Sequence, residues 1–258
     1  MSGNARSAPL QLFIALDLPS ASEALVLISK IGRLRSASGL VSCGLKVGLE
    51  LFTSAGPDFV RRQVDETFSV FVDLKFHDIP NTVYGAVKAA CALGAQMLTL
   101  HLEGGGDMCR AAVQARDEVF AALGKSDSRG GASFGKTLLL GVSILTSTGG
   151  EAGEIRDRVL DFAGKAQSWA LDGLVCSGHE VADVKKSCGE NFYCLCPGIR
   201  FAGTVVNDDQ SRICSPADAV RLGADFLVMG RPVTNAPDPA LAVVAALAEM
   251  EKGLRQRT

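Results

Sequence analysis

The sequence predicts an α/β protein that folds as a (β/α)8 TIM barrel. Eight short apolar segments alternate with helix-compatible segments along 258 residues, which is the size and repeat number of that barrel. Most of the apolar segments are too uniformly hydrophobic for strands with one wet face, as is typical of buried parallel strands. A doubly wound sheet is the alternative, but eight strands without a sign of a second domain favour closure into a barrel.

The elements follow one another in a regular strand-then-helix order. The expected strands cover residues 10–17, 43–48, 70–76, 95–102, 137–145, 171–176, 192–197 and 225–230. The expected helices cover residues 20–34, 55–66, 82–94, 105–124, 154–170, 215–224 and 238–254. Ser20 and Glu23 have the spacing of a capping box at the start of the first helix. No linker interrupts this order, so we expect one domain over 1–258, with a flexible tail at 1–9.

Composition excludes several classes of protein. The chain has 26 basic and 28 acidic residues, so no basic excess suggests a nucleic acid or a membrane surface as partner. Its longest apolar runs fall short of the roughly 18 residues that span a bilayer. The N-terminus lacks the apolar region of a secretion signal, and the eight cysteines form no CxxC pair. We therefore expect a cytoplasmic protein with reduced, mostly buried thiols.

Charged residues lie where the expected strands end. The first strand ends in Asp17, the second carries Lys46, and the third carries Asp73 and Lys75 and is followed by Asp78. Active sites of such barrels lie at the carboxyl ends of the strands, so these side chains are expected to meet at one rim. Buried ion pairs stabilise proteins weakly, which favours a functional reason for the cluster. Alternating Asp and Lys also favour one another's ionised forms in a poorly solvated site.

A second group of residues is suited to phosphate. Gly230 ends the eighth strand and lets backbone N–H groups approach an anion, with Arg231 beside it and Arg200 after the seventh strand. The loops after strands 7 and 8 form the usual phosphate site of this barrel. The polar stretch 201–216 between them is expected to be a mobile loop that closes over a ligand, with Gln210 reaching in.

Two other patterns do not predict function. Residues 130–137, GGASFGKT, match the P-loop pattern. A P-loop follows a strand and opens a helix, whereas this segment follows a polar stretch and leads into an expected strand. The three histidines have no metal-site spacing, so no metal is expected. His101, near the end of the fourth strand, is as well explained by a structural role as by a place in the site floor.

The segment DLKFHDIPNTV (73–83) resembles the D-x-K-x-x-D-I-P-N-T signature of the orotidine 5′-monophosphate decarboxylase family. Further matches are ALDLP, LKVGLELF, ILTS, PGIR, DDQSRI and LVMGRPVT, in order and correctly spaced along essentially the whole chain. The D-x-K-x-x-D motif alone is shared by a wider group of decarboxylases and aldolases, whereas the full set is highly specific.

The resemblance implies a role for each matching residue. Lys46, Asp73, Lys75 and Asp78 would form a charged catalytic network, with Asp78 reaching into the neighbouring subunit's site. The enzyme would thus be a homodimer with shared sites, and Ile79 and Thr82 would cross the interface. The remaining substrate-binding positions would be Asp17 and Lys46 at ribose, Ser147 and possibly Thr146 at the pyrimidine, and Arg200, Gln210, Gly230 and Arg231 at phosphate.

The implied reaction is decarboxylation of orotidine 5′-monophosphate to uridine 5′-monophosphate and CO₂, the last step of de novo pyrimidine synthesis. No motif for a metal, pyridoxal or thiamine is visible, so no cofactor is expected and Lys75 would protonate the carbanion at C6. One alternative is a metal-dependent sugar-phosphate decarboxylase or aldolase of the same wider group. Another is a non-catalytic barrel that binds nucleotide phosphate.

Overall fold

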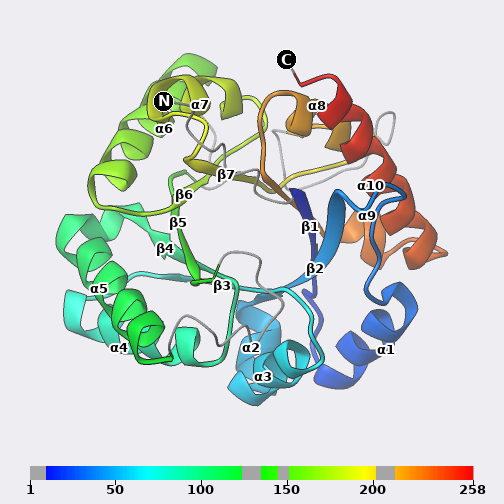
Figure 1. Cartoon of the computed structure of the whole chain (residues 1–258), viewed down its shortest axis with the longest axis horizontal. Helices are drawn as coiled ribbons and strands as arrows, with labels where there is room; N and C mark the ends of the chain where they lie inside the picture. Colours follow the sequence, from blue (N-terminus) through cyan, green and yellow to red (C-terminus); the bar gives the residue numbers. More distant parts are fainter. Residues whose placement is uncertain (1–9, 124–134, 145–150, 202–212, 258) are drawn as a thin grey trace.

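Eight parallel strands close into a barrel surrounded by helices in a computed structural model that describes residues 10–123, 135–144, 151–201 and 213–257 (Figure 1). Each strand pairs with the next along the chain, and β1 pairs with β8 to complete the circle. The predicted (β/α)8 barrel is thereby confirmed. The assignment of 1–258 to one domain with a flexible tail at 1–9 stays a prediction, because the tail lies outside the described residues.

The strands lie close to their predicted positions. They are β1 (Leu10–Ala15), β2 (Val41–Gly48), β3 (Val70–Phe76), β4 (Met97–His101), β5 (Leu138–Val142), β6 (Gly173–Val175), β7 (Tyr193–Cys196) and β8 (Phe226–Met229). All eight predicted segments contain a strand. Most of the strands are shorter than predicted, since the ladder ends where the chain turns toward the next helix.

The helices pack outside the barrel (Figure 1). They are α1 (Ala21–Ile31), α2 (Leu49–Ala55), α3 (Pro57–Asp65), α4 (Pro80–Ala92), the 3-10 turn η1 (Leu102–Gly104), α5 (Gly105–Leu123), α6 (Ala152–Ser168), α7 (Val181–Cys188), α8 (Pro216–Arg221), α9 (Arg231–Thr234) and α10 (Pro239–Arg255). The predicted N-cap of α1 at Ser20 is confirmed, because the Ser20 hydroxyl accepts a hydrogen bond from the Glu23 N–H at 3.3 Å.

Three helices were not predicted from the sequence. α2 follows β2 without a loop, and Gly56, with φ of 71°, separates it from α3. α7 and α9 are short, with eight and four residues. Helices of this length lack enough turns to show a clear 3.6-residue pattern, and tertiary packing stabilises them instead.

The barrel interior is layered along its axis. Side chains of Gln11, Ser42, Ser69 and Gln96 hydrogen bond to one another at the amino-terminal ends of the strands. An apolar layer that includes Phe13, Phe71, Met97, Leu140, Leu195 and Phe226 lies above them. Because strand residues alternate faces, the next inward positions at the carboxyl ends belong to the charged residues predicted for the site.

Most of the cysteines are buried in the packed interior. All eight are free thiols, and six of them are buried, which confirms the prediction that most of them are buried. Burial raises the pKa of Cys43 to about 12 and that of Cys91 to about 11. Such thiols stay protonated at neutral pH and are poor nucleophiles. Among the described residues, no helix is both long and apolar enough to cross a membrane.

Candidate active site

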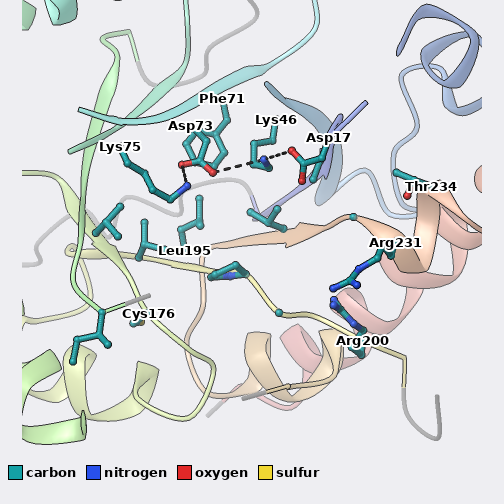
Figure 2. Close-up of a pocket in the computed structure, with 18 residues that line it drawn as sticks. Asp17, Lys46, Phe71, Asp73, Lys75, Cys176, Leu195, Arg200, Arg231 and Thr234 are labelled. Atoms are coloured by element: carbon teal, nitrogen blue, oxygen red, sulfur yellow. Dashed lines mark hydrogen bonds and ion pairs between the residues drawn. The ribbon is translucent and has the colours of Figure 1, made fainter. Parts of the chain in front are cut away.

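Four alternating charges meet at the carboxyl ends of β1, β2 and β3. The Lys46 ammonium lies 2.9 Å from Asp17 Oδ1 and 3.6 Å from Asp73 Oδ2. The Lys75 ammonium lies 3.0 Å from Asp73 Oδ1. Figure 2 shows the resulting row Asp17–Lys46–Asp73–Lys75 along one side of a pocket. Of the five charged residues predicted to meet at one rim, the structure brings these four together.

An irregularity in β3 points Lys75 into the pocket. The pairing of β3 with β4 shifts register between Val72 and Phe76, and Lys75 adopts a φ of 49°. A left-handed conformation is unfavourable for a residue with a side chain, so the surrounding structure must hold it. The consequence is that Asp73 and Lys75, two residues apart, bond to each other while both line the cavity.

Gly48 leaves the space that the Asp17–Lys46 pair occupies. A Cβ atom at this position would lie 2.9 Å from Asp17 Oδ1 and 2.9 Å from Lys46 Nζ. Both distances are shorter than van der Waals contact, so any larger residue would displace the pair. The sequence offers a signal for this role in the K-V-G triplet that ends β2, but its meaning is clear only with the neighbouring side chains in place.

The cavity has a volume of about 320 Å³, at the lower end of the range for small-molecule sites. Its walls between the charges are apolar and include Val142, Ile144, Val175, Leu195 and Val228. Apolar walls lower the local dielectric and strengthen interactions between charges and a bound molecule.

Two arginines lie on the far side of the cavity from Lys75. Arg200 follows β7 and Arg231 begins α9, and both line the cavity together with Gly230. Figure 2 shows the two guanidinium groups directed at the same region. Burial lowers the pKa of Arg200 from its ordinary value. A desolvated cation gains most from an anion placed beside it, so this end of the cavity is suited to phosphate.

The chain is anchored on both sides of the predicted closing loop. Ile199 and Cys214 form a parallel bridge, and the Arg200 N–H donates to the Cys214 carbonyl oxygen at 3.0 Å. The predicted residues Thr146, Ser147 and Gln210, and most of the stretch 201–216, lie outside the described residues.

Asp78, Ile79 and Thr82 do not line this cavity. All three are exposed, and Ile79, at the start of α4, has 67% of its surface accessible. The Asp78 carboxylate accepts a hydrogen bond from the Ile79 N–H at 2.7 Å. Within a single chain the structure therefore brings together Asp17, Lys46, Asp73 and Lys75 but leaves Asp78 outside the network.

Sequence reasoning missed several residues of the site. Thr99, on β4, donates a hydrogen bond to Asp73 Oδ1 at 2.9 Å, and Cys176 and Thr234 line the cavity. Threonine is common in strands, so nothing in the sequence distinguishes Thr99 before β4 is placed beside β3.

His101 stacks on His77 beside the site, with ring centroids 5.2 Å apart. It is not among the residues that line the cavity. Burial lowers the pKa of His101, and His77 and Lys75 act in the same direction, whereas Glu103 opposes them. The lowered pKa favours the neutral ring, which adds no positive charge beside Lys75.

Comparison with known proteins agrees with this geometry. A sequence profile described as "Orotidine 5'-phosphate decarboxylase / HUMPS family" matches residues 10–246. An orotidine 5'-phosphate decarboxylase of Nitratidesulfovibrio vulgaris (strain DP4) is 47% identical over 245 residues, which cover 93% of this chain and 97% of the relative.

The chain belongs to this family. A second relative, an orotidine 5'-phosphate decarboxylase of Halorhodospira halophila, is 44% identical over 250 residues, covering 94% of this chain and 96% of the relative. The crystal structure of orotidine 5'-phosphate decarboxylase from Lactobacillus acidophilus superposes with a TM-score of 0.74 at 31% identity, covering 93% of this chain and 99% of that chain. The family resemblance noted in the sequence is confirmed.

Proposed function

We propose that this chain is an orotidine 5′-monophosphate decarboxylase that forms uridine 5′-monophosphate and CO₂, the last step of de novo pyrimidine synthesis. The observation that carries the proposal is the row Asp17–Lys46–Asp73–Lys75 beside an apolar cavity. Membership of the family supports the same reaction.

The proposed substrate orientation follows from the two ends of the cavity. The phosphate lies at Arg200, Gly230 and Arg231, with Gln210 completing its contacts, and the ring that loses CO₂ lies at Asp73 and Lys75. Asp17 and Lys46 contact the ribose hydroxyls, and Ser147, with Thr146, binds the pyrimidine edge. This assignment is supported by the positions of the arginines and of Lys75 on opposite sides of the cavity (Figure 2).

Loss of CO₂ from C6 of the pyrimidine leaves a carbanion that has no adjacent electron sink. Lys75 stabilises this charge because its ammonium faces the cavity, and it then donates a proton to C6. Asp73 lies next to the departing carboxylate and holds Lys75 in place through the 3.0 Å ion pair. The reaction then needs no cofactor, because fixed protein charges stabilise the transition state.

Binding of the phosphate supplies further stabilisation. The largest enzymatic rate accelerations require the activation free energy to fall by about 23 kcal/mol. A single ion pair contributes less than this. Interactions with a non-reacting part of the substrate can be used to orient and enclose the reacting part. Closure of the stretch 201–216 over the phosphate is the step we assign to this role.

The metal-dependent sugar-phosphate enzyme is the nearest rival, and the position of Lys46 argues against it. Such enzymes typically carry a carboxylate ligand on the second strand, whereas here an ammonium lies between Asp17 and Asp73. A fixed positive charge at that point repels Mg²⁺. A non-catalytic phosphate-binding barrel would use Arg200 and Arg231 but has no need for the Asp73–Lys75 pair.

We further propose that the enzyme is a cytoplasmic homodimer whose partner contributes Asp78 to the site. Support comes from the exposed positions of Asp78, Ile79 and Thr82, which follow β3 directly. An exposed isoleucine beside a charged site is well placed for an interface between two copies.

The test is to follow the absorbance of orotidine 5′-monophosphate during incubation with the purified protein in EDTA, where turnover gives a decrease. We expect full turnover, because no step uses a metal. Turnover that is lost in EDTA and restored by Mg²⁺ would favour the rival, and binding without turnover under any condition would favour the non-catalytic barrel.

A further inference from the structure

Thr99 is the side chain that connects the reacting pair to the neighbouring strand. It lies on β4 with 1% of its surface accessible. Its Oγ1 atom lies 3.0 Å from the Lys75 backbone nitrogen and 2.9 Å from Asp73 Oδ1. A single hydroxyl thus contacts both members of the Asp73–Lys75 pair.

The direction of both hydrogen bonds is fixed by the donors available. The Lys75 backbone N–H can only donate, so Thr99 Oγ1 accepts that bond. A carboxylate can only accept, so the single hydroxyl proton of Thr99 goes to Asp73 Oδ1. Since the Lys75 ammonium also donates to Asp73 Oδ1 at 3.0 Å, the four groups form a closed ring of interactions.

This ring compensates for the irregular backbone at Lys75. Where β3 and β4 lose register, the Lys75 N–H bonds to the Thr99 hydroxyl. The left-handed φ of 49° persists only where surrounding contacts hold it. The same hydroxyl fixes one oxygen of Asp73, leaving Oδ2 facing Lys46 at 3.6 Å.

We infer that Thr99 is a positioning residue for the reaction, which rests on the function proposed above. It holds the Asp73 carboxylate and the Lys75 ammonium at the separation and orientation that the decarboxylation step needs. Thr99 is not among the residues that line the cavity, so it acts through Asp73 and Lys75 and not by contact with the substrate.

The experiment compares kcat and KM of Thr99→Val, which keeps the side-chain shape and removes the hydroxyl, with Thr99→Ser, which keeps the hydroxyl. Loss of hydrogen bonds to a charged group predicts that Thr99→Val lowers kcat by about 10- to 100-fold. KM is expected to stay within about threefold, since binding through the phosphate end is preserved. Thr99→Ser is expected to retain kcat within about threefold of the wild type.

The matched control is Thr137→Val. The Thr137 hydroxyl donates to the Ala95 carbonyl oxygen at 2.8 Å, at the start of β5 and the opposite end of the barrel from the cavity. This variant loses a hydrogen bond of similar length and is expected to keep wild-type kcat. If Thr99→Val does not fold, Thr99→Ala removes the same hydroxyl with a smaller side chain. It is expected to show the same loss of kcat.

Three results would overturn the inference. One is wild-type kcat in a folded variant that lacks the hydroxyl. The second is a Thr99→Ser variant as slow as Thr99→Val, and the third is an equal loss in Thr137→Val. Failure of the proposed function is distinguishable from these results, because the wild-type protein itself would then show no turnover and the positioning role would fall with it.

Discussion

Lys75 and Asp73 illustrate how a strand places two opposite charges on one face of the chain. Alternation places residues 73 and 75 on the same face, and at the irregularity in β3, where Lys75 has a positive φ, the Lys75 ammonium lies 3.0 Å from Asp73. Lys46 is held similarly between Asp17 and Asp73. Each of the two lysines therefore has a carboxylate partner, and the Asp17–Lys46 pair depends on the space that Gly48 leaves free.

Gly48→Ala tests that dependence. The added methyl group would lie 2.9 Å from Asp17 Oδ1 and from Lys46 Nζ. These atoms are the ends of flexible side chains, so we expect the fold to survive and the pair to separate. The expected result is a loss of kcat/KM of about 10-fold or more for orotidine 5′-monophosphate, with unfolding free energy within about 1 kcal/mol of the wild type.

Gly164→Ala is the matched control for this substitution. Gly164 lies in α6, and an added Cβ meets no atom within 4 Å. It is expected to leave kinetics unchanged and to stabilise the protein by up to about 1 kcal/mol, the difference between glycine and alanine inside a helix. Unchanged kcat/KM in Gly48→Ala would contradict the spatial role of Gly48.

At the scale of the elements, the sequence predicts strands better than it predicts their irregularities. All eight expected strands form, because uniformly apolar runs bounded by turns mark buried strands. The short helices α2, α7 and α9 and the register shift at β3 were not predicted. These features depend on packing between segments distant in sequence, as the contact of Thr99 with Asp73 shows.

The candidate site was predictable to a similar degree. The positions of Asp17, Lys46, Asp73 and Lys75 follow from strand alternation and from the rule that sites lie at carboxyl ends. The absence of Asp78 from the network within one chain does not follow from these rules, because it depends on where the segment after β3 turns. Thr99 and Gly48 carry no charge, so their roles emerge only from distances between strands.

A buried ion pair outside the site holds α7 against the barrel. Lys185 Nζ lies 2.8 Å from Asp225 Oδ2 and also donates to the carbonyl oxygens of Glu190 and Phe192. Burial raises the pKa of Asp225, and Lys185 and the Cys194 N–H oppose this effect. The pair connects α7, β7 and the start of β8 near the amino-terminal end of the barrel.

Lys185→Met is expected to lower the free energy of unfolding by about 3–5 kcal/mol, because it leaves a buried carboxylate without its cation. Urea denaturation measures this difference. Lys165→Met, which breaks the exposed Lys165–Asp161 pair, is the control and is expected to change stability by no more than about 0.5 kcal/mol. A loss below about 1 kcal/mol in Lys185→Met would contradict the assigned role of the pair.

At the scale of the whole molecule, the residues that pack the barrel interior and the charged residues of the candidate site lie at different levels along the barrel axis. A polar layer and an apolar layer fill the lower and middle interior, and the charged rim lies at the carboxyl ends of the strands. Asp78 and Ile79, in the segment after β3, are exposed and do not line the chain's own cavity. This layout suits a dimer in which each chain completes its partner's site.

In the proposed dimer, Lys75 acts in its own chain's cavity while Asp78 acts in the partner's. The most direct measurement is turnover of orotidine 5′-monophosphate by Lys75→Ala and Asp78→Ala, each alone and then mixed after verified subunit exchange. We predict that each variant alone is inactive. The 1:1 mixture should recover roughly a quarter of wild-type activity, because half of the randomly formed dimers are mixed and each has one intact site. Full turnover by Lys75→Ala alone, or a mixture that stays inactive, would contradict the account.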